Sequence, residues 1–190
     1  MPSPSFFFVY SPGLNAPLYA RPNEVGLFAT LNINYSVNYW IKKGLDRSKI
    51  IIGLPTYGHS FRLVNPFNNR LGAPAEDYGS VGVLGFTSYS EVCWFQKSNF
   101  NVWAEYDTHT CSPFLSAGVE WISYEDERSL ECKTNYAKDN HFGGIMVFSL
   151  NTDDYHFTCD DNYEVNRVGG KRDFPLLRKV HSILFQNTTN

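Results

Sequence analysis

Residues 49–55 read Lys-Ile-Ile-Ile-Gly-Leu-Pro, and this short stretch decides the fold class. Its β-branched residues follow one another without the polar alternation of a half-exposed strand, so we expect a parallel strand that is buried on both faces. The preceding segment, 32–44, carries apolar residues at the i, i+4, i+7 and i+8 positions of a helix, namely Ile33, Val37, Trp40 and Ile41. Asn32 is the expected N-cap and Gly44 the stop. A helix is therefore predicted to lead into a central strand.

The same order of elements returns near the end of the chain. Ser123-Tyr124-Glu125-Asp126 has the pattern of a capping box, which is expected to open a helix that runs towards Asn140. The apolar run 145–150 follows as a second buried strand. A last amphipathic helix, capped by Asp173 and ending near Phe185, is expected to bury Leu176, Val180, Ile183 and Leu184. Two helix-strand units and a closing helix predict α/β architecture with parallel strands.

Residues 60–122 differ from both flanks, since they are rich in Gly, Asn, Tyr and Phe and show short strand-like runs without helical periodicity. A bare loop of that length would be unusual in a compact domain. We therefore expect a small α+β subdomain, inserted at the C-terminal end of the first strand, where α/β folds place their binding sites. The predicted organisation is 1–59, 60–122 and 123–190.

The composition excludes several classes of protein. Of the 190 residues, 43% are hydrophobic and 18% are charged, which is the balance of a globular chain. The longest apolar runs, 6–10 and 50–54, are far shorter than the roughly 20 residues of a membrane-spanning helix. With 16 basic against 19 acidic residues and no block of Lys and Arg, nucleic acid is not an expected partner. A cofactor is not expected either, because no Gly-rich phosphate loop is present.

The four cysteines and two glycosylation sequons bear on the compartment. Cys93, Cys111, Cys132 and Cys159 lack zinc-ligand spacing, so no metal site is expected. The sequons at Asn34 and Asn187 favour secretion, whereas the alternative is four free thiols in a cytosolic protein. Residues 1–5 contain no basic residue before a five-residue apolar run, so a signal peptide is not expected here. Either the protein is cytosolic, or the chain is the C-terminal part of a longer secreted protein.

Acidic residues and histidines supply the candidates for chemistry. Asp153 and Asp154 follow the second strand closely, where they either face a cleft or cap the next turn through backbone N–H groups. His59 follows the first strand and is either a packed residue or a base. The acids at 125–127 are expected to open a helix, and those at 160–161 to be solvated. The many aromatic rings suit a sugar ligand, although core packing also accounts for them.

Several motifs occur in the order found in one family. They are Asn15-Ala16-Pro17-Leu18-Tyr19, Tyr39-Trp40, the run from Lys49 to Phe61, Gly72-Ala73-Pro74, Tyr89-Ser90-Glu91-Val92-Cys93, and Gly143 to Phe148 with Asp153-Asp154. From about Tyr10 to Cys159 the chain resembles the C-terminal half of animal glycoside hydrolase family 18 chitinases and chitinase-like proteins. The resemblance implies an incomplete (β/α)₈ barrel, with its seventh and eighth strands here and the chitinase insertion domain between them.

The resemblance also implies a set of sugar-binding residues. Tyr57 matches a tyrosine that contacts the sugar near the cleavage point, and Glu91 matches a glutamate that lines the cleft. His59 stands where active members usually carry an arginine, and Phe148 replaces the tryptophan that usually forms the floor of the subsite. Both departures are expected to weaken chitin binding, because Phe lacks the indole N–H and His lacks the guanidinium fork.

The resemblance further implies that Cys93 pairs with Cys159, which leaves Cys111 with Cys132. Family 18 enzymes cleave β-1,4-linked N-acetylglucosamine with a glutamic acid that ends an Asp-x-x-Asp-x-Asp-x-Glu motif, and nothing in this sequence fits that motif. We therefore expect an extracellular, chitin-binding part of a chitinase that does not hydrolyse chitin as given. The alternative is a non-catalytic, lectin-like chitinase-like protein.

Overall fold

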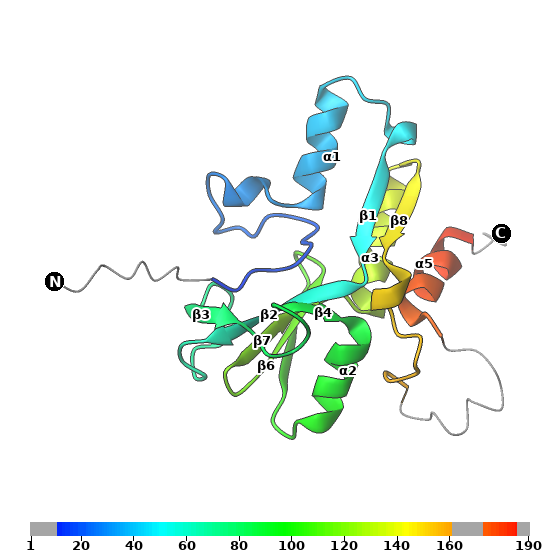
Figure 1. Cartoon of the computed structure of the whole chain (residues 1–190). Coiled ribbons are helices and arrows are strands. Elements are labelled where there is room, and N and C mark those ends of the chain that lie inside the picture. Colours follow the sequence, from blue (N-terminus) through cyan, green and yellow to red (C-terminus); the bar gives the residue numbers. More distant parts are fainter. Residues whose placement is uncertain (1–10, 161–172, 186–190) are drawn as a thin grey trace.

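The structure, a computed structural model, describes residues 11–160 and 173–185. Three sites considered above lie outside these residues: the apolar run 6–10, Asp161 and the sequon at Asn187. Within the described ranges the chain has two regions, a parallel strand pair with helices and an antiparallel sheet with one helix (Figure 1).

The first region is built on two parallel strands, as predicted. Strand β1 (Ile51–Pro55) pairs with β8 (Gly144–Phe148), with Ile51 opposite Gly144 and Pro55 opposite Phe148. Helices α3 (Glu127–Asp139) and α5 (Pro175–Phe185) pack against each other beside this pair (Figure 1). Their common core holds Leu18, Val37, Ile52, Leu54, Leu130, Leu176 and Val180.

Helix α1 (Ile33–Lys42) begins where the sequence predicted. The Asn32 side chain accepts a hydrogen bond from the Tyr35 backbone N–H, which caps the first turn. Val37 is buried against the core, whereas Trp40, which belongs to the same helical pattern of apolar residues, is 56% exposed. Among the described residues Trp40 packs edge-on against Tyr39 and projects away from the core cluster.

The burial of the parallel strands also differs from the prediction. Ile52 and Leu54 are buried, whereas Ile51 is 54% exposed and Met146 of β8 is 49% exposed. Alternate residues of a strand point to opposite faces of the sheet. The described helices cover only the face that carries Ile52 and Leu54, so the strands are buried on one face and open on the other.

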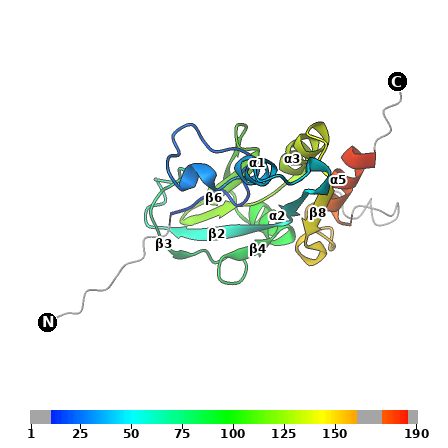
Figure 2. The ribbon, with the colours of Figure 1, turned by 90° about the horizontal axis from the view of Figure 1, so that it is seen from above.

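The second region is a six-stranded antiparallel sheet in the order β3-β2-β7-β6-β5, with β4 also paired to β2. Its strands are β2 (Tyr57–Leu63), β3 (Ala75–Tyr78), β4 (Phe86–Ser88), β5 (Trp103–Asp107), β6 (Ser112–Ala117) and β7 (Glu120–Ser123). Helix α2 (Tyr89–Ser98) lies on this sheet (Figure 2). The sheet begins at Tyr57, so the domain boundary proposed after residue 59 falls inside β2.

Helix α3 begins three residues later than the sequence pattern indicated. Asp126, rather than Ser123, is the N-cap, and it forms a capping box with Ser129. Ser123 ends β7 instead, and Glu127 lies in the first turn of the helix. Glu125, one of the acids expected to open the helix, lies before the cap and is buried. The helix therefore begins after the second of two overlapping cap patterns, Asp126 with Ser129, and not after the first.

Helix α5 buries Leu176, Val180 and Ile183 as predicted. Its first N–H groups are not capped by Asp173, however, because the Asp153 carboxylate accepts from the backbone N–H groups of Leu176 and Leu177. Asp173 is exposed enough to pair with Arg178 instead. Asp153, which precedes the two N–H groups by 23 and 24 positions in the sequence, therefore supplies the cap.

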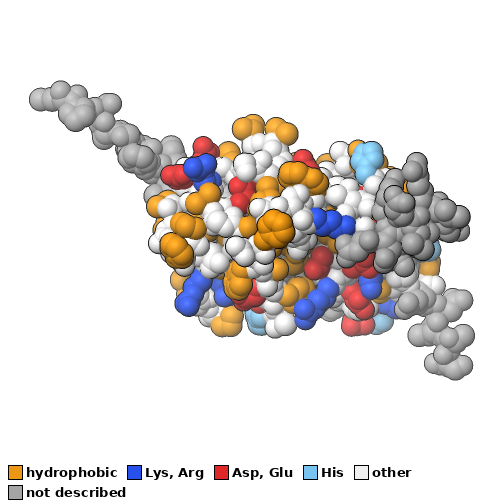
Figure 3. All heavy atoms as spheres, turned by 90° about the horizontal axis from the view of Figure 1, so that it is seen from below, with side chains coloured by type: hydrophobic (Ala, Val, Ile, Leu, Met, Phe, Trp, Pro, Cys, Tyr) orange, Lys and Arg blue, Asp and Glu red, His pale blue; other side chains and the backbone are white. Residues whose placement is uncertain are grey.

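In the described ranges, no helix is both long and apolar enough to cross a bilayer. The face of the molecule seen from below Figure 1 mixes hydrophobic side chains with Lys, Arg, Asp and Glu (Figure 3).

Candidate functional site

The ends of the two parallel strands are tied together at Thr56. Its backbone N–H donates to the carbonyl of Phe148 over 2.9 Å, and its hydroxyl donates to the carbonyl of Ser149 over 2.6 Å. The same hydroxyl lies 2.7 Å from the Thr152 hydroxyl. This buried link holds the C-terminal end of β8 beside the start of β2, where Tyr57 follows Thr56 directly.

Four aromatic rings meet at this junction, and we call Tyr57, His59, Phe86 and Phe148 the aromatic cluster. The Tyr57 ring stacks on Phe86 with the centroids 4.7 Å apart, and it meets His59 and Phe148 edge-on at 5.8 and 6.3 Å. Residues directly opposite on paired strands point to the same face, and His59 lies opposite Phe86. The cluster therefore brings together residues from β2, β4 and β8.

The aromatic cluster is accessible to a ligand. Phe148 is 57% exposed and Phe86 is 39% exposed, while Tyr57 and His59 are half-buried. Such rings can stack on the apolar face of a flat, amphipathic molecule, and the Tyr57 hydroxyl and the His59 imidazole add polar contacts. Phe86 was not predicted from sequence. The only available signal was its place just before the Ser88 cap, since its pairing with His59 appears only in the folded sheet.

Burial sets the protonation state of His59. Loss of solvent lowers the pKa of the His59 imidazole, and a hydrogen bond with the Gly85 backbone opposes this shift in part. The imidazole is consequently neutral at physiological pH, where it can both donate and accept hydrogen bonds.

The carboxylate of Glu91, the fourth residue that the resemblance assigns to the sugar site, is engaged in hydrogen bonds with Ser88. It accepts from the Ser88 backbone N–H over 2.7 Å and from the Ser88 hydroxyl over 2.8 Å. The first of these bonds is one half of a capping box that opens helix α2. Glu91 thus holds the turn next to the aromatic cluster, because Ser88 lies opposite Tyr57 in the sheet.

Asp153 and Asp154 are both buried, and their carboxylates bind backbone groups. Asp153 caps α5, as described above, while Asp154 accepts from the Ser90 hydroxyl over 2.9 Å and from the Cys159 N–H over 2.8 Å. Burial raises the pKa of Asp153, whereas its backbone hydrogen bonds lower it. Of the two alternatives, this geometry favours capping over a position in an open cleft.

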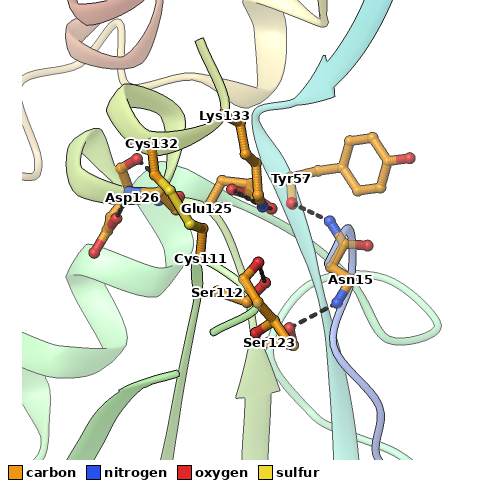
Figure 4. Close-up of polar contacts among 11 residues, drawn as sticks. Asn15, Tyr57, Cys111, Ser112, Ser123, Glu125, Asp126, Cys132 and Lys133 are labelled. Atoms are coloured by element: carbon orange, nitrogen blue, oxygen red, sulfur yellow. Dashed lines mark hydrogen bonds and ion pairs between the residues drawn. A yellow bond between two sulfur atoms is a disulfide. The ribbon is translucent and has the colours of Figure 1, made fainter. Parts of the chain in front are cut away.

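A buried ion pair, which no sequence pattern predicted, joins Glu125, between β7 and α3, to Lys133 of α3. The Lys133 ammonium is 2.5 and 2.7 Å from the two oxygens of Glu125, and both side chains are fully buried (Figure 4). Burial raises the pKa of Glu125 and lowers that of Lys133, while their mutual attraction opposes both shifts. The spacing of eight residues, with Glu125 outside the helix, gives no sequence signal of a pair.

A second polar link joins the N-terminal segment to the site. The Asn15 backbone N–H donates to the Ser123 hydroxyl over 2.8 Å, and its side-chain amide donates to the Tyr57 carbonyl over 2.9 Å (Figure 4). Asn15 therefore connects the start of β2 with the end of β7, and it fixes the backbone on which the Tyr57 ring is mounted.

Two disulfides are formed, with the pairing that the family resemblance implied. Cys93 of α2 is bonded to Cys159, and Cys111 is bonded to Cys132 of α3 (Figure 4). All four cysteines are therefore bonded, and the alternative of four free thiols is wrong. Asn34, the described sequon residue, lies in the first turn of α1, where its side-chain oxygen accepts from the Tyr136 hydroxyl over 2.9 Å.

No group of three or more potential ligands among the described residues could hold a metal ion. The side chains of the aromatic cluster themselves offer stacking faces and a few polar contacts.

Comparison with known proteins identifies the family. The sequence model described as glycosyl hydrolases family 18 matches residues 6–153. Human chitinase-3-like protein 2 is 35% identical over 147 residues, which are 75% of this chain and 37% of that protein.

Comparison with solved structures identifies the same family. Human YKL-39, described as a pseudo-chitinase with retained chitooligosaccharide binding, superimposes with a TM-score of 0.81 at 31% identity, over 92% of this chain and 45% of that one. The immunomodulatory active chitinase of Trichuris suis gives a TM-score of 0.80 at 33% identity, over 92% and 46%. The chain spans less than half the length of these relatives. It belongs to glycosyl hydrolases family 18.

Proposed function

We propose that this chain binds chitooligosaccharides through the aromatic cluster and does not hydrolyse them. The observation that carries the proposal is the stack of Tyr57 on Phe86, with Phe148 edge-on beside them and more than half exposed. Sugar rings bind well to such faces because their C–H groups stack on aromatic carbon. A related protein, human YKL-39, is described as a pseudo-chitinase that retains chitooligosaccharide binding.

The absence of hydrolysis rests on the acids near the site. Glycoside hydrolysis needs a carboxylic acid that can reach the leaving oxygen. The carboxylates around the aromatic cluster are engaged otherwise: Glu91 caps α2, Asp153 caps α5, and Glu125 is sealed in its ion pair. In addition, no part of the sequence fits the Asp-x-x-Asp-x-Asp-x-Glu motif of active members.

We also propose the arrangement of the chain within the family fold. Strands β1 and β8 take the places of the seventh and eighth strands of a (β/α)₈ barrel, with residues 60–122 as the insertion domain between them. The two disulfides favour a secreted protein, because such bonds persist in oxidising compartments.

Titration calorimetry with chitohexaose tests the binding proposal. Phe148→Ala and Phe86→Ala should each weaken binding about five- to tenfold, because each removes a stacking face. Phe67→Ala is the matched control, since Phe67 is an exposed phenylalanine that lies outside the aromatic cluster. Equal weakening by the control, or no binding by the unmodified chain, would overturn the proposal.

Hydrolysis is tested separately by incubating chitohexaose with the purified chain and analysing the products by mass spectrometry. The hexamer should remain intact. Shorter oligomers that form with the unmodified chain, but not with a Phe148→Ala sample prepared in the same way, would show that the chain is an enzyme. That outcome would refute the non-hydrolytic part of the proposal and leave the binding part unaffected.

A further inference from the structure

A second hollow lies on the antiparallel sheet, on the same sheet face as the aromatic cluster. Residues two apart in a strand share a face, so Phe61 of β2 points to the side of Tyr57 and His59. Phe61 meets Trp121, which lies opposite it on β7, and Trp121 stacks on Phe114 of β6. Phe114 in turn lines a pocket of about 630 Å³, which we call the β5 pocket. A row of aromatic rings therefore leads from the cluster towards the pocket.

The N-terminal segment separates the β5 pocket from the aromatic cluster. Ser123 of β7 lies opposite His59 on one side and opposite Phe114 on the other. The Ser123 hydroxyl accepts from the Asn15 backbone N–H, and Leu14 packs against the core cluster that holds Phe114. The segment thus covers the sheet face between the two places. None of the four residues of the aromatic cluster lines the β5 pocket, so the pocket is a separate site.

The walls of the β5 pocket are held in place by bonds to the sheet. They come from β5, from the loop between β2 and β3 and from the N-terminal segment, and they include Trp103, Glu105, Asn69, Arg70, Arg21 and Asn23. The Asn69 carbonyl accepts from the Trp121 indole N–H over 3.0 Å, and the Asn69 amide donates to the Ser116 hydroxyl over 2.9 Å. Arg21 pairs with Asp107 of β5 at 3.1 Å. Because the walls are anchored in this way, binding costs little ordering of the protein.

The charges in the β5 pocket cancel. Arg21 is neutralised by Asp107, which leaves one cation, Arg70, and one anion, Glu105, in the lining. Both side chains are exposed, and within the described ranges neither of them forms an ion pair. A pocket of this kind suits a neutral ligand, because the negative groups of an anion would meet Glu105 as well as Arg70.

The β5 pocket combines a stacking face with forked polar groups. The Trp103 ring meets Phe114 edge-on at 5.7 Å and is 41% exposed, so part of the indole is open to a ligand. The Arg70 guanidinium offers parallel N–H donors, and the Glu105 carboxylate offers two acceptor oxygens. Two adjacent hydroxyl groups of a sugar ring match either fork, because each hydroxyl can both donate and accept. The combination suits a pyranose ring with adjacent free hydroxyls.

This chemistry distinguishes the β5 pocket from a chitin site. In a β-1,4-linked chain of N-acetylglucosamine, C2 carries an acetamido group and C4 carries the linkage, so an inner ring has no two adjacent free hydroxyls. A β-1,4-linked chain of glucose keeps the hydroxyls at C2 and C3 of every ring. The two chains share a backbone and differ at the group that the forks of Arg70 and Glu105 would recognise.

We propose that the β5 pocket binds a neutral oligosaccharide of unsubstituted hexoses. Trp103 stacks on one ring, and Arg70 and Glu105 hold adjacent hydroxyls of that ring. The pocket therefore adds a second class of sugar ligand to the chain, at a site that does not depend on the aromatic cluster.

Tryptophan NMR can monitor this pocket by itself, because no residue of the aromatic cluster is a tryptophan. The full chain, which has four tryptophans, is labelled with 5-fluorotryptophan, and the Trp103 signal is assigned with Trp103→Phe. Cellohexaose, the unsubstituted counterpart of chitohexaose, should shift the Trp103 signal. The signal of Trp94, an exposed residue of α2, should not move. Absence of a shift at Trp103, or an equal shift at Trp94, would overturn the proposal.

Chitohexaose is the matched ligand control. The affinity that the Trp103 signal reports should be about tenfold weaker for chitohexaose than for cellohexaose, because only the terminal ring of chitohexaose keeps adjacent free hydroxyls. Equal affinities would show that the pocket does not recognise adjacent hydroxyls, and would overturn the assigned class of ligand.

Substitutions at the forks identify the groups that hold the sugar. Arg70→Lys keeps the charge but removes the fork, and Glu105→Gln replaces one acceptor oxygen with a donor, so each should weaken cellohexaose binding about five- to tenfold. Arg62→Lys is the matched control, since Arg62 is an exposed arginine of β2 that pairs with Glu76 outside the pocket, and it should change binding less than twofold. Unchanged affinity in either pocket variant, or equal weakening by the control, would contradict the proposal.

Chitohexaose binding at the aromatic cluster should be unaltered in the Arg70 and Glu105 variants when it is measured by calorimetry. Conversely, Phe148→Ala should leave the response of the Trp103 signal to cellohexaose unchanged, because Phe148 does not line the β5 pocket. Failure of this proposal is therefore distinct from failure of the proposed function.

Discussion

The antiparallel sheet and the parallel strand pair bury their residues very differently. In β6 and β7 consecutive residues are buried, including Leu115, Trp121 and Ile122 with no exposed surface. In β1 burial alternates, and Ile51 is half exposed beside the buried Ile52. The inner strands β6 and β7 are thus covered on both faces, while the outer strands β3 and β5 are largely exposed, and the parallel pair is covered on one face. Similar apolar runs in the sequence give different burial, because burial depends on which elements pack on each face.

The largest expected loss of stability comes from removing a buried ring from the core of the antiparallel sheet. Trp121 stacks on Phe114, with the centroids 5.3 Å apart, and its indole N–H donates to the Asn69 carbonyl over 3.0 Å. Trp121→Ala should lower the free energy of unfolding by about 3–5 kcal/mol, measured by urea denaturation. Trp94→Ala is the control, since Trp94 is largely exposed and should cost less than about 1 kcal/mol. Equal losses of unfolding free energy in the two variants would mean that the Trp121 ring is not packed in the core of the sheet.

The second prediction compares the two faces of one strand. Ile52→Ala should lower the free energy of unfolding by about 2–4 kcal/mol, because it leaves a cavity against the helices. Ile51→Ala removes the same atoms from the open face and should cost less than about 1 kcal/mol. Urea denaturation of both variants measures the difference directly. A cost at Ile51 that matches the cost at Ile52 would show that another part of the protein covers this face.

The smallest expected effect is a dependence on pH at the junction of the two regions. The pKa of His59 is lowered in the folded chain, so the unfolded chain binds a proton first as the pH falls. The contribution of neutral His59 to the free energy of unfolding is therefore fully present above about pH 6.5, and it is lost as the pH falls through the folded pKa. His59→Gln should flatten the change in unfolding free energy between pH 7.5 and 5. An unaltered pH profile in this variant would contradict the assignment.

Local patterns located helices α1, α3 and α5 and the two parallel strands, but they did not locate helix α2. Asn32 caps α1 as expected, and Leu176, Val180 and Ile183 form the buried face of α5, because capping and helical spacing depend on neighbouring residues. The cap of α5 was missed because Asp153 reaches it only in the folded chain.

The candidate site was predicted less completely, for the same physical reason. The family resemblance named Tyr57, His59 and Phe148, and His59 was also noted for following a strand, but Phe86 enters the cluster through strand pairing. Glu91 has the expected position in the sequence, yet its carboxylate is taken by Ser88. Contacts between distant segments decide these roles, and no local pattern encodes them.

The buried pair of Glu125 and Lys133 constrains how this sequence can evolve. Loss of one partner leaves a charge without water or counterion, at a cost of about 3–5 kcal/mol against a typical total stability of about 5–15 kcal/mol. Replacement of both by apolar residues of similar volume avoids that penalty. The two positions are therefore expected to vary together among descendants of this gene, so that a lineage in which one changes alone would carry a weakened fold.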